Sequence, residues 1–295
     1  MTEGLPPTEA VDEATRGLDR MPTAELVKVL IGAQGRAVDA VRAAAPQIAR
    51  AADAIAARLR AGGRLHYVGA GTSGRLGALD AAELPPTFGT PPSLARAHIA
   101  GGTPALTAAV EGAEDDASAA GELNREVRAE DVVIGISASG GAAYVLAALE
   151  RARAAGAYTI GLTNAPESPL VGQVDLAIVL ATGAEPLAGS TRMVAGTAQK
   201  IALGALSTAA MVRLGKVYDN LMVDLVATNA KLRRRALRLV RTLCAVDDAR
   251  ANELLAEAEG RVKVAVVMQR LSVDVQAARA RLASHGDSLR EALEG

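Results

Sequence analysis

Three short segments of the chain combine hydroxyl side chains with glycine. They contain Thr72, Ser73 and Gly74 in "GAGTSG", Ser137, Ser139 and Gly140 in "ISASGG", and Ser190 and Thr191 in "GSTR". Hydroxyls and backbone N–H groups at the start of a helix can hold a phosphate group without a lysine. The alternative for any one segment is ordinary helix capping by serine or threonine. Three such segments together favour a site for a small molecule that carries one phosphate.

The first segment also resembles two nucleotide-binding motifs. "GAGTSG" matches G-x-G-x-x-G, but a single match is weak evidence for a dinucleotide. A dinucleotide site also needs an acidic residue at the end of the next strand, where the sequence has "AGG" at 100–102. A P-loop needs lysine and a hydroxyl residue where Arg75 and Leu76 stand. Neither a dinucleotide nor a nucleoside triphosphate is expected.

Glu83 is a candidate for proton transfer. On a helix that begins near Ser73, it shares a face with Leu76 and Leu79. Apolar surroundings raise the pKa of a carboxyl group, which suits a proton donor at neutral pH. The pair Pro85–Pro86 is expected to end this helix. The alternative is an acidic side chain at a frayed helix end that reaches solvent.

Glu114, in "VEGAEDD", is a second candidate. The alternative for this acidic cluster is that it precedes a helix and complements the helix dipole. We expect Asp115 and Asp116 to do so, and we assign no role to Glu111 or Glu185.

The elements that would position these residues follow an α/β pattern. Between residues 64 and 181, β-branched runs alternate with alanine-rich segments; the runs are "RLHYV", "LARAHIA", "DVVIGIS", "AYTIGLT" and "DLAIVLA". This alternation predicts a parallel sheet with helices on both faces. Residues 23–60 predict two helices, and only helices are expected after about residue 189. Loops at the carboxyl ends of parallel strands share one crevice, so the first two hydroxyl segments should face one site.

The composition excludes several classes of partner. The 295 residues carry 32 basic and 33 acidic side chains, a formal charge of −1, and 2% aromatic residues. No nucleic-acid or membrane partner is therefore expected. One cysteine and an acidic, polar start of the chain predict a cytoplasmic protein without disulfides. The histidines, which lie far apart in the sequence, predict no metal site; they are His66, His98 and His285.

Two segments have simple structural interpretations. The uncharged stretch 132–149 contains "SASGG" at its centre and is expected to form strand, loop and helix rather than a membrane span. The basic segment 231–241 has apolar residues on one helical face, so its arginines are expected to form the solvated side.

The longer motifs resemble those of one enzyme family. "GAGTSGRLGALDAAELPPTFGT", "IAGG", "VEGAEDD", "ISASG", "GSTRMVAGTAQK" and "LGKVYDNLMVDLVATNAKL" are similar to motifs of the N-acetylmuramic acid 6-phosphate etherases, members of the sugar isomerase (SIS) domain group. The resemblance is dense from about residue 64 to residue 235. It implies a three-layer α/β SIS domain at 61–228, between an N-terminal helical segment at 1–60 and a C-terminal helical domain at 229–295.

The resemblance also implies an activity. These enzymes are homodimeric cytoplasmic lyases of cell-wall sugar recycling, which cleave a lactyl ether to give N-acetylglucosamine 6-phosphate and D-lactate. Once the sugar opens to its aldehyde, the C2 proton becomes acidic and lactate can leave from C3. A base, an acid and a water suffice, so no metal or organic cofactor is expected. By resemblance Glu83 is the proton donor and Glu114 the base at C2, and the reverse assignment stays open.

The chain departs from the family pattern after the second hydroxyl segment. Gly141, Ala142 and Ala143 precede Tyr144, where the family has Arg, Thr and Pro. Losing one neutral hydrogen bond to phosphate weakens binding by about 0.5–1.5 kcal/mol. Leu84 stands where a cysteine is common. The departures leave room for an altered substrate, and an aldose–ketose isomerase or a non-catalytic phosphosugar sensor stays as an alternative function.

Overall fold

The computed structural model describes residues 6–225 and 230–295. They form two compact units: the first comprises the chain up to Ala81 together with Ser93–Ser207, and the second comprises Ala82–Pro92 with Thr208–Gly295. The predicted domain boundaries after residues 60 and 228 stay predictions, and residue 228 lies outside the described part of the chain.

A parallel five-stranded sheet forms the centre of the first unit. Its strands are β1 (Leu65–Gly69), β2 (Ala95–Ile99), β3 (Val132–Ser137), β4 (Tyr158–Thr163) and β5 (Leu176–Val179). The spatial order is β2-β1-β3-β4-β5, and every neighbouring pair is parallel. Each strand coincides with one of the five β-branched runs, so the predicted sheet is confirmed.

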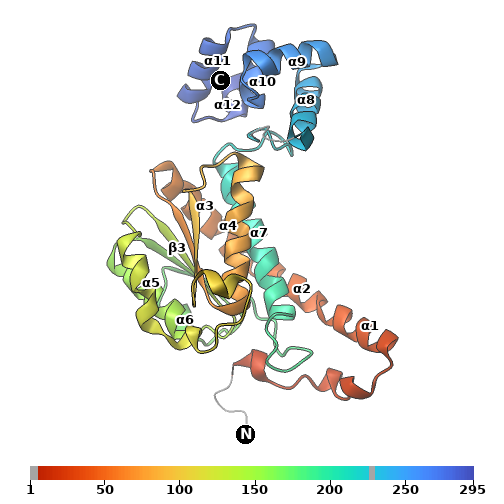
Figure 1. The fold of residues 1–295 in the computed structure, drawn as a ribbon, viewed down its shortest axis with the longest axis vertical. Helices are drawn as coiled ribbons and strands as arrows, with labels where there is room; N and C mark the ends of the chain where they lie inside the picture. Colours follow the sequence, from red (N-terminus) through yellow and green to blue (C-terminus); the bar gives the residue numbers. More distant parts are fainter. Residues whose placement is uncertain (1–5, 226–229) are drawn as a thin grey trace. The chain divides into compact units, whose positions relative to one another are not determined.

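Helices cover both faces of this sheet (Figure 1). They are α4 (Gly71–Phe88), α5 (Ala143–Ala154), α6 (Pro169–Gly172) and α7 (Val194–Arg213). On one face, a Cβ added to Gly135 of β3 would lie 2.5 Å from Leu149 of α5. On the other, a Cβ added to Gly77 of α4 would lie 2.8 Å from Tyr67 of β1. The predicted α/β sandwich is therefore confirmed, and small residues let both helices approach the strands closely.

Three helices precede the sheet, so the prediction of two helices over 23–60 is wrong. They are α1 (Thr23–Ala33), α2 (Gly35–Ala43) and α3 (Ala45–Arg60). The first break lies at Gln34, beside Gly35, whose helix propensity is low. The second precedes Pro46, which stands in the first turn of α3, where its missing N–H costs nothing.

Helix α4 continues through Pro85 and Pro86, so the prediction that these prolines end it is wrong. Both lie in its last turns, and the Gly89 N–H still donates to the Pro85 carbonyl at 3.0 Å. Gly89 has φ +63°, the left-handed conformation in which many helices end. Leu84 and Phe88, on either side of the prolines, are buried, which holds this part of the helix.

Short 3₁₀ helices complete the first unit; they are η1 (Pro7–Glu9), η2 (Glu13–Thr15), η3 (Leu18–Arg20), η4 (Thr103–Leu106), η5 (Ala113–Asp115) and η6 (Ala117–Arg125). The stretch 132–149 forms β3, a loop and α5, as predicted. No helix within 6–225 and 230–295 is both long and apolar enough to span a membrane.

The second unit is helical, and its helices are α8 (Ala230–Cys244), α9 (Asp248–Glu257), α10 (Val262–Leu271), α11 (Val275–Ser284) and α12 (Leu289–Glu294). They enclose a core of their own around α10, whose residues 262–268 are all buried. In α8, Ala236 and Leu239 are buried while Arg234 and Arg238 are exposed. The predicted solvated arginine face is confirmed.

Candidate functional site

The order in which the chain adds strands to the sheet reverses at one point, beside β1. From β1 the chain moves outward to the edge strand β2, and then returns to β3 on the other side of β1. Ligands of open α/β sheets bind outside the carboxyl ends of the strands at such a point. Gly69, which ends β1, is aligned with Ile136 near the end of β3. The first two hydroxyl segments therefore follow neighbouring strand ends, as predicted.

The loop between β3 and α5 has its shape fixed by its own hydroxyls. Ser137 Oγ accepts a hydrogen bond from the Gly140 N–H at 3.0 Å, and Ser139 Oγ accepts one from the Gly141 N–H at 3.3 Å. Gly140 has φ +66°, and a Cβ there would lie 2.1 Å from Ser168 Oγ. Only glycine fits this position. The glycine and the two serine hydrogen bonds together fix the backbone conformation of the turn that leads into α5.

The N-terminus of α5 is a candidate anion site. Ala142 is its N-cap residue, and no side chain of the described residues caps it. The first N–H groups of a helix have no partner within the helix and carry a partial positive charge. The start of α5 therefore offers donors directly after Ser137 and Ser139.

The loop after β1 is packed more tightly. Ser73 is buried, and its Oγ donates to Gln199 Oε1 of α7 at 2.9 Å. Gly74 allows α4 to approach β1, since a Cβ there would lie 2.7 Å from the Gly69 carbonyl oxygen. Thr72 is half-buried, and its Cγ2 would lie 3.3 Å from a Cβ on Gly196 of α7. Ser73 thus joins two helices in this structure.

A buried acid occupies the N-terminus of α7. The Glu185 carboxylate accepts hydrogen bonds from the N–H groups of Val194 and Ala195, both at 2.8 Å. Ser190 and Thr191, which were predicted to bind phosphate, precede these residues and are half-buried. A phosphate directly at this helix end would have to displace Glu185, so the start of α5 is the better-prepared anion site.

Glu114 lies in η5 and is exposed. The preceding Ala113 packs against the apolar cluster that contains Tyr144 of α5. Arg75 of α4 holds the loop that leads to η5, because its Nε and Nη2 donate to the carbonyls of Ala105 and Ala108 at 2.9 Å. The element that carries Glu114, η5, thereby packs against α5.

Acidic residues after Glu114 complement a helix start, in part as predicted. Asp116 is the N-cap of η6, and its Oδ1 accepts from the N–H groups of Ser118 and Ala119. The Ser118 hydroxyl also donates to Asp116 Oδ1. This bond, followed by those from the two N–H groups, lowers the pKa of the Asp116 carboxyl.

Within the described residues, Glu83 does not have the apolar surroundings that were predicted for it. Glu83 is exposed, and Leu79 is 44% exposed. The buried stripe of α4 instead passes through Asp80 and Leu84. Asp80 is tolerated inside because the Tyr67 hydroxyl donates to it at 2.6 Å. Glu83 falls in the second unit and Glu114 in the first, and the catalytic pairing of the two stays a prediction.

Two pockets lie near opposite ends of α5. One of about 620 Å³ is found where β2 ends, and its lining includes Ile99, Gly101 and Gly102, together with Ser118 of η6 and Tyr144 of α5. Its volume lies in the range of small-molecule sites.

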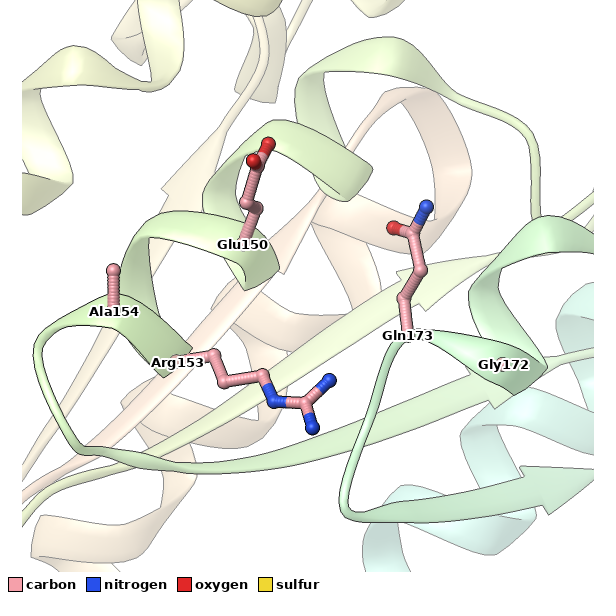
Figure 2. A pocket seen from close by; sticks show the side chains of 5 residues that line it. All are labelled: Glu150, Arg153, Ala154, Gly172 and Gln173. Atoms are coloured by element: carbon pink, nitrogen blue, oxygen red, sulfur yellow. The ribbon is translucent and has the colours of Figure 1, made fainter.

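The other pocket, of about 500 Å³, is lined by Glu150, Arg153 and Ala154 of α5 with Gly172 and Gln173 (Figure 2). It lies at the C-terminal end of α5, away from the hydroxyl segments, so of these two pockets the first is the one beside the predicted site.

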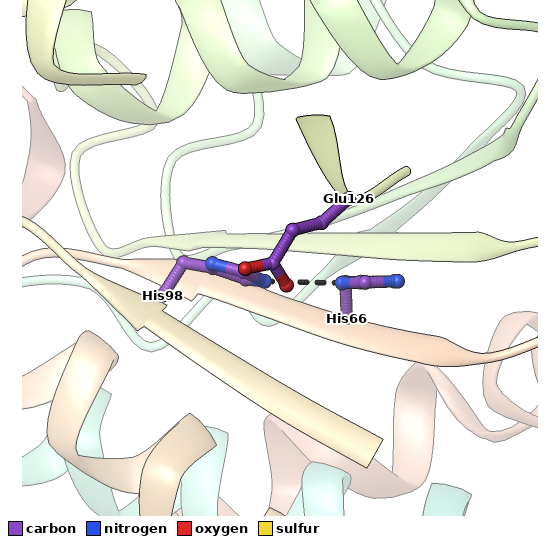
Figure 3. A group of neighbouring side chains, drawn as sticks. All are labelled: His66, His98 and Glu126. Carbon is purple, nitrogen blue, oxygen red and sulfur yellow. Dashed lines mark hydrogen bonds between the residues drawn. The ribbon is translucent and has the colours of Figure 1, made fainter. Parts of the chain in front are cut away.

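Two histidines that lie 32 residues apart in the sequence, His66 and His98, lie side by side in the sheet. His66 Nδ1 and His98 Nε2 are 3.0 Å apart (Figure 3). The third histidine, His285, lies in the second unit. Burial, followed by the charge of His98, lowers the pKa of His66 to about 4 although Asp131 acts in the opposite direction.

Comparison with known proteins decides the family. Residues 47–153 match the family model of the glucokinase regulatory protein N-terminal SIS domain, and residues 107–209 match that of the SIS domain. The chain is 52% identical to N-acetylmuramic acid 6-phosphate etherase of Deinococcus radiodurans, over 97% of this chain and 94% of that protein. It is 46% identical to the Salmonella choleraesuis etherase over the full length of both. The chain belongs to the N-acetylmuramic acid 6-phosphate etherase family.

Membership of the etherase family confirms the predicted SIS fold and the assignment to the carbon–oxygen lyases. A solved phosphoheptose isomerase from Francisella tularensis has a similar fold, with a TM-score of 0.51 and 21% identity over 65% of this chain and 98% of that one. At this identity the likeness concerns the fold alone.

Relative to the etherase pattern, the start of α5 has lost one hydroxyl, at position 142. At the neighbouring Gly141, a Cβ would meet only Ser139 Oγ among the described residues, at 3.9 Å. Ala142 stands at the N-cap of α5, where a threonine would be favourable.

The sequence interpretation missed residues whose hydrogen bonds support the loops of the etherase site. Gln199 Nε2 donates to Asn164 Oδ1 at 3.0 Å, and the Asn164 N–H donates to the Ala138 carbonyl at 3.1 Å. Asn164 follows the end of β4, so its position at a carboxyl strand end was the available signal. Glu185 and Arg75 gave no such signal, because their partners are backbone groups, which any residue type supplies.

Proposed function

We propose that this protein cleaves the lactyl ether of N-acetylmuramic acid 6-phosphate and releases N-acetylglucosamine 6-phosphate and D-lactate. Etherases with 46–52% identity over nearly the whole chain support this substrate. The observation that carries the proposal is the start of α5, which no side chain among residues 6–225 and 230–295 caps, next to two serines at the point where the strand order reverses.

The substrate's phosphate would bind at the start of α5. Ser137 Oγ and Ser139 Oγ each accept a hydrogen bond from a loop N–H. A hydroxyl that already accepts one bond keeps its own hydrogen to donate. Both serines can therefore donate to a phosphate oxygen without breaking the loop, and Thr72, Ser190 and Thr191 complete the proposed hydroxyl set.

The two glutamates would carry the proton transfers. In the open-chain aldehyde, Glu114 removes the C2 proton and the electron pair delocalises into the carbonyl group. Glu83 donates a proton to the ether oxygen as the C3–O bond breaks, so lactate leaves with its hydroxyl restored. Water then adds to the unsaturated aldehyde at C3, with a proton returning to C2. General acid and base groups of this kind each contribute about 10²–10⁴-fold to the rate.

The decisive experiment is turnover of N-acetylmuramic acid 6-phosphate by purified protein in H₂¹⁸O. Elimination followed by hydration predicts D-lactate without label and one ¹⁸O at C3 of the sugar. Label in the lactate hydroxyl would contradict this route. Conversion of an aldose phosphate to a ketose without lactate would favour an isomerase, and phosphosugar binding without turnover would favour a sensor.

We also propose that the protein is a cytoplasmic homodimer that acts in cell-wall sugar recycling, as the family implies. None of the eleven side chains of α1, all within the described residues, is buried. Val27 is 46% exposed and Ile31 is 67% exposed. Covering this apolar face with a second copy would stabilise both chains.

Light scattering during size-exclusion chromatography tests the dimer. We expect the mass of a dimer for the unmodified chain and for Lys28→Ala, an exposed change on the same helix. The double variant Val27→Lys, Ile31→Lys should run as a monomer. A monomeric unmodified chain would contradict the dimer.

A further inference from the structure

A cluster of metal-ligating side chains lies at the β2 edge of the sheet, apart from the hydroxyl loops. His66 lies in β1 and His98 in β2. In the parallel register His98 pairs with Val68, two residues after His66. Residues two apart on a strand share a face, so both imidazoles lie on the same side of the sheet.

Three potential ligand atoms converge there. One ring nitrogen of His66, one of His98 and one carboxylate oxygen of Glu126 all lie within 4.8 Å of one another. Figure 3 shows the Glu126 carboxylate next to the hydrogen bond that joins the two rings. The 3.0 Å between His66 Nδ1 and His98 Nε2 approaches the separation of two ligands on one ion, given metal–nitrogen distances of about 2.0–2.1 Å.

Asp131 orients His66 toward this cluster. Its carboxylate lies 3.3 Å from His66 Nε2, so it accepts the Nε2–H and leaves the lone pair on Nδ1. Asp131 itself is fixed by the N–H groups of Arg64 and Arg128, at 2.8 and 3.0 Å. A carboxylate that holds the far nitrogen of a histidine is the usual partner of a metal-bound imidazole.

The other two ligands can reach an ion without rearranging the fold. Shifting the His98 proton to Nδ1 would free its Nε2. Glu126 Oε2 binds Arg96 at 2.7 Å, and the carboxylate has a second oxygen. The Glu126 side chain is 38% exposed, so water can fill a fourth position.

We propose that His66, His98 and Glu126 bind one divalent transition-metal ion of the zinc class, with Asp131 orienting His66. Two imidazoles and a carboxylate suit Zn²⁺ and disfavour Ca²⁺ and Mg²⁺, which prefer oxygen ligands. The ion would link the edge strand β2 to β1 and to the end of η6. It stabilises this edge of the sheet and takes no part in the proposed etherase chemistry.

Calorimetric titration with ZnCl₂ tests the site in the untagged full-length protein, after treatment with EDTA and removal of the chelator. We expect one saturable site and a higher Tm in the presence of Zn²⁺. His98→Ala and Glu126→Gln should each lower the affinity about 100-fold or more, since losing even an orienting partner costs about 10–100-fold. Co²⁺, used as a spectroscopic probe, should give the visible absorption of a four-coordinate ion only in chains with all three ligands.

Matched controls separate this site from adventitious binding. His285→Gln removes the histidine of the second unit, and Glu130→Gln removes an exposed glutamate four residues after Glu126. Both should keep the affinity and the Tm shift. Since Glu126 is partly exposed, Glu126→Gln decides the matter even if His98→Ala fails to fold. No saturable binding by the unmodified chain, or equal affinity in all four variants, would overturn the proposal.

Discussion

Ser73 of α4 donates a hydrogen bond to Gln199 of α7, with 2.9 Å between Oγ and Oε1, and both side chains are buried. Gln199 in turn donates to Asn164, beyond the end of β4. This network fixes the floor of the proposed site to three elements that lie far apart in the sequence. It gives the Ser73 hydroxyl a structural role that the phosphate prediction alone does not include.

Replacing Ser73 by alanine should therefore reduce stability. The buried Gln199 oxygen would lose its donor, at a cost of about 1–3 kcal/mol in the free energy of unfolding. Urea denaturation of Ser73→Ala, Gln199→Met and the double variant should show a coupling of about 0.5–3 kcal/mol. Lys200→Ala, an exposed neighbour, is the control. An unchanged stability combined with a raised KM would instead assign Ser73 to phosphate binding.

The Glu185 carboxylate should stabilise the first unit by a similar free energy of unfolding. Glu185→Gln keeps the volume but leaves a single acceptor oxygen for the N–H groups of Val194 and Ala195. The free energy of unfolding should fall by about 1–3 kcal/mol, measured by urea denaturation. Glu167→Gln, which changes an exposed side chain, should stay within about 0.5 kcal/mol of the parent. A result for Glu185→Gln inside that same range would show that the cap contributes little.

The acid–base assignment predicts a separation of binding from turnover. Glu83→Gln and Glu114→Gln remove a titratable proton at nearly constant volume, so D-lactate release should fall about 10²–10⁴-fold in each. Binding of the product N-acetylglucosamine 6-phosphate, measured by calorimetry, should persist because the phosphate site is untouched. Glu111→Gln, in the same acidic segment as Glu114, should retain activity. Full turnover in either principal variant would remove that glutamate from the mechanism.

Ala142→Thr should restore a favourable helix start. A threonine at the N-cap of α5 can accept a first-turn N–H, which should raise the free energy of unfolding by about 0.5–2 kcal/mol. Its own hydrogen could donate to phosphate, lowering KM up to about tenfold. Steady-state kinetics and urea denaturation measure the two effects. Ala154→Thr, at the other end of α5, should leave KM unchanged; a parallel fall in both variants would exclude a local effect.

The buried His66 makes stability depend on pH. Its folded pKa of about 4 lies below its ordinary value of 6.5, so between these values the unfolded chain binds a proton that the folded chain does not. Stability from this group is complete above pH 6.5 and is lost as pH falls toward 4, by about 3 kcal/mol in total.

The groups around His66 titrate as well, so the test is a difference between two chains. Asp131, His98 and Arg64 all interact with His66, and a carboxylate oxygen of Glu126 lies within 4.8 Å of a ring nitrogen of both histidines. Urea denaturation between pH 7 and pH 4, with EDTA present, should show a weaker pH dependence in His66→Leu than in the unmodified chain. Equal dependence in both chains would mean that His66 stays protonated on folding.

Local pattern was enough to predict the five strands, the flanking helices and the hydroxyl loops at strand ends. Each depends on residues that are neighbours in the chain: β-branched runs, helical periodicity, and glycine next to serine. The helices of residues 23–60 were less well predicted, because the break at Gln34 involves small residues with weak preferences. Proline positions likewise gave the wrong end for α4, whose buried Leu84 and Phe88 outweigh the missing N–H groups.

By itself the sequence determined the fold class, the family and the residue types available for phosphate binding and proton transfer. Only the tertiary structure decided which of those groups are engaged. It showed that Ser73 faces Gln199, that Glu185 fills the start of α7 whereas no side chain of the described residues caps α5, and that His66 meets His98. The reason is physical: strand register and helix packing bring together groups that are distant in the chain, and such partners leave no periodic signal in the sequence.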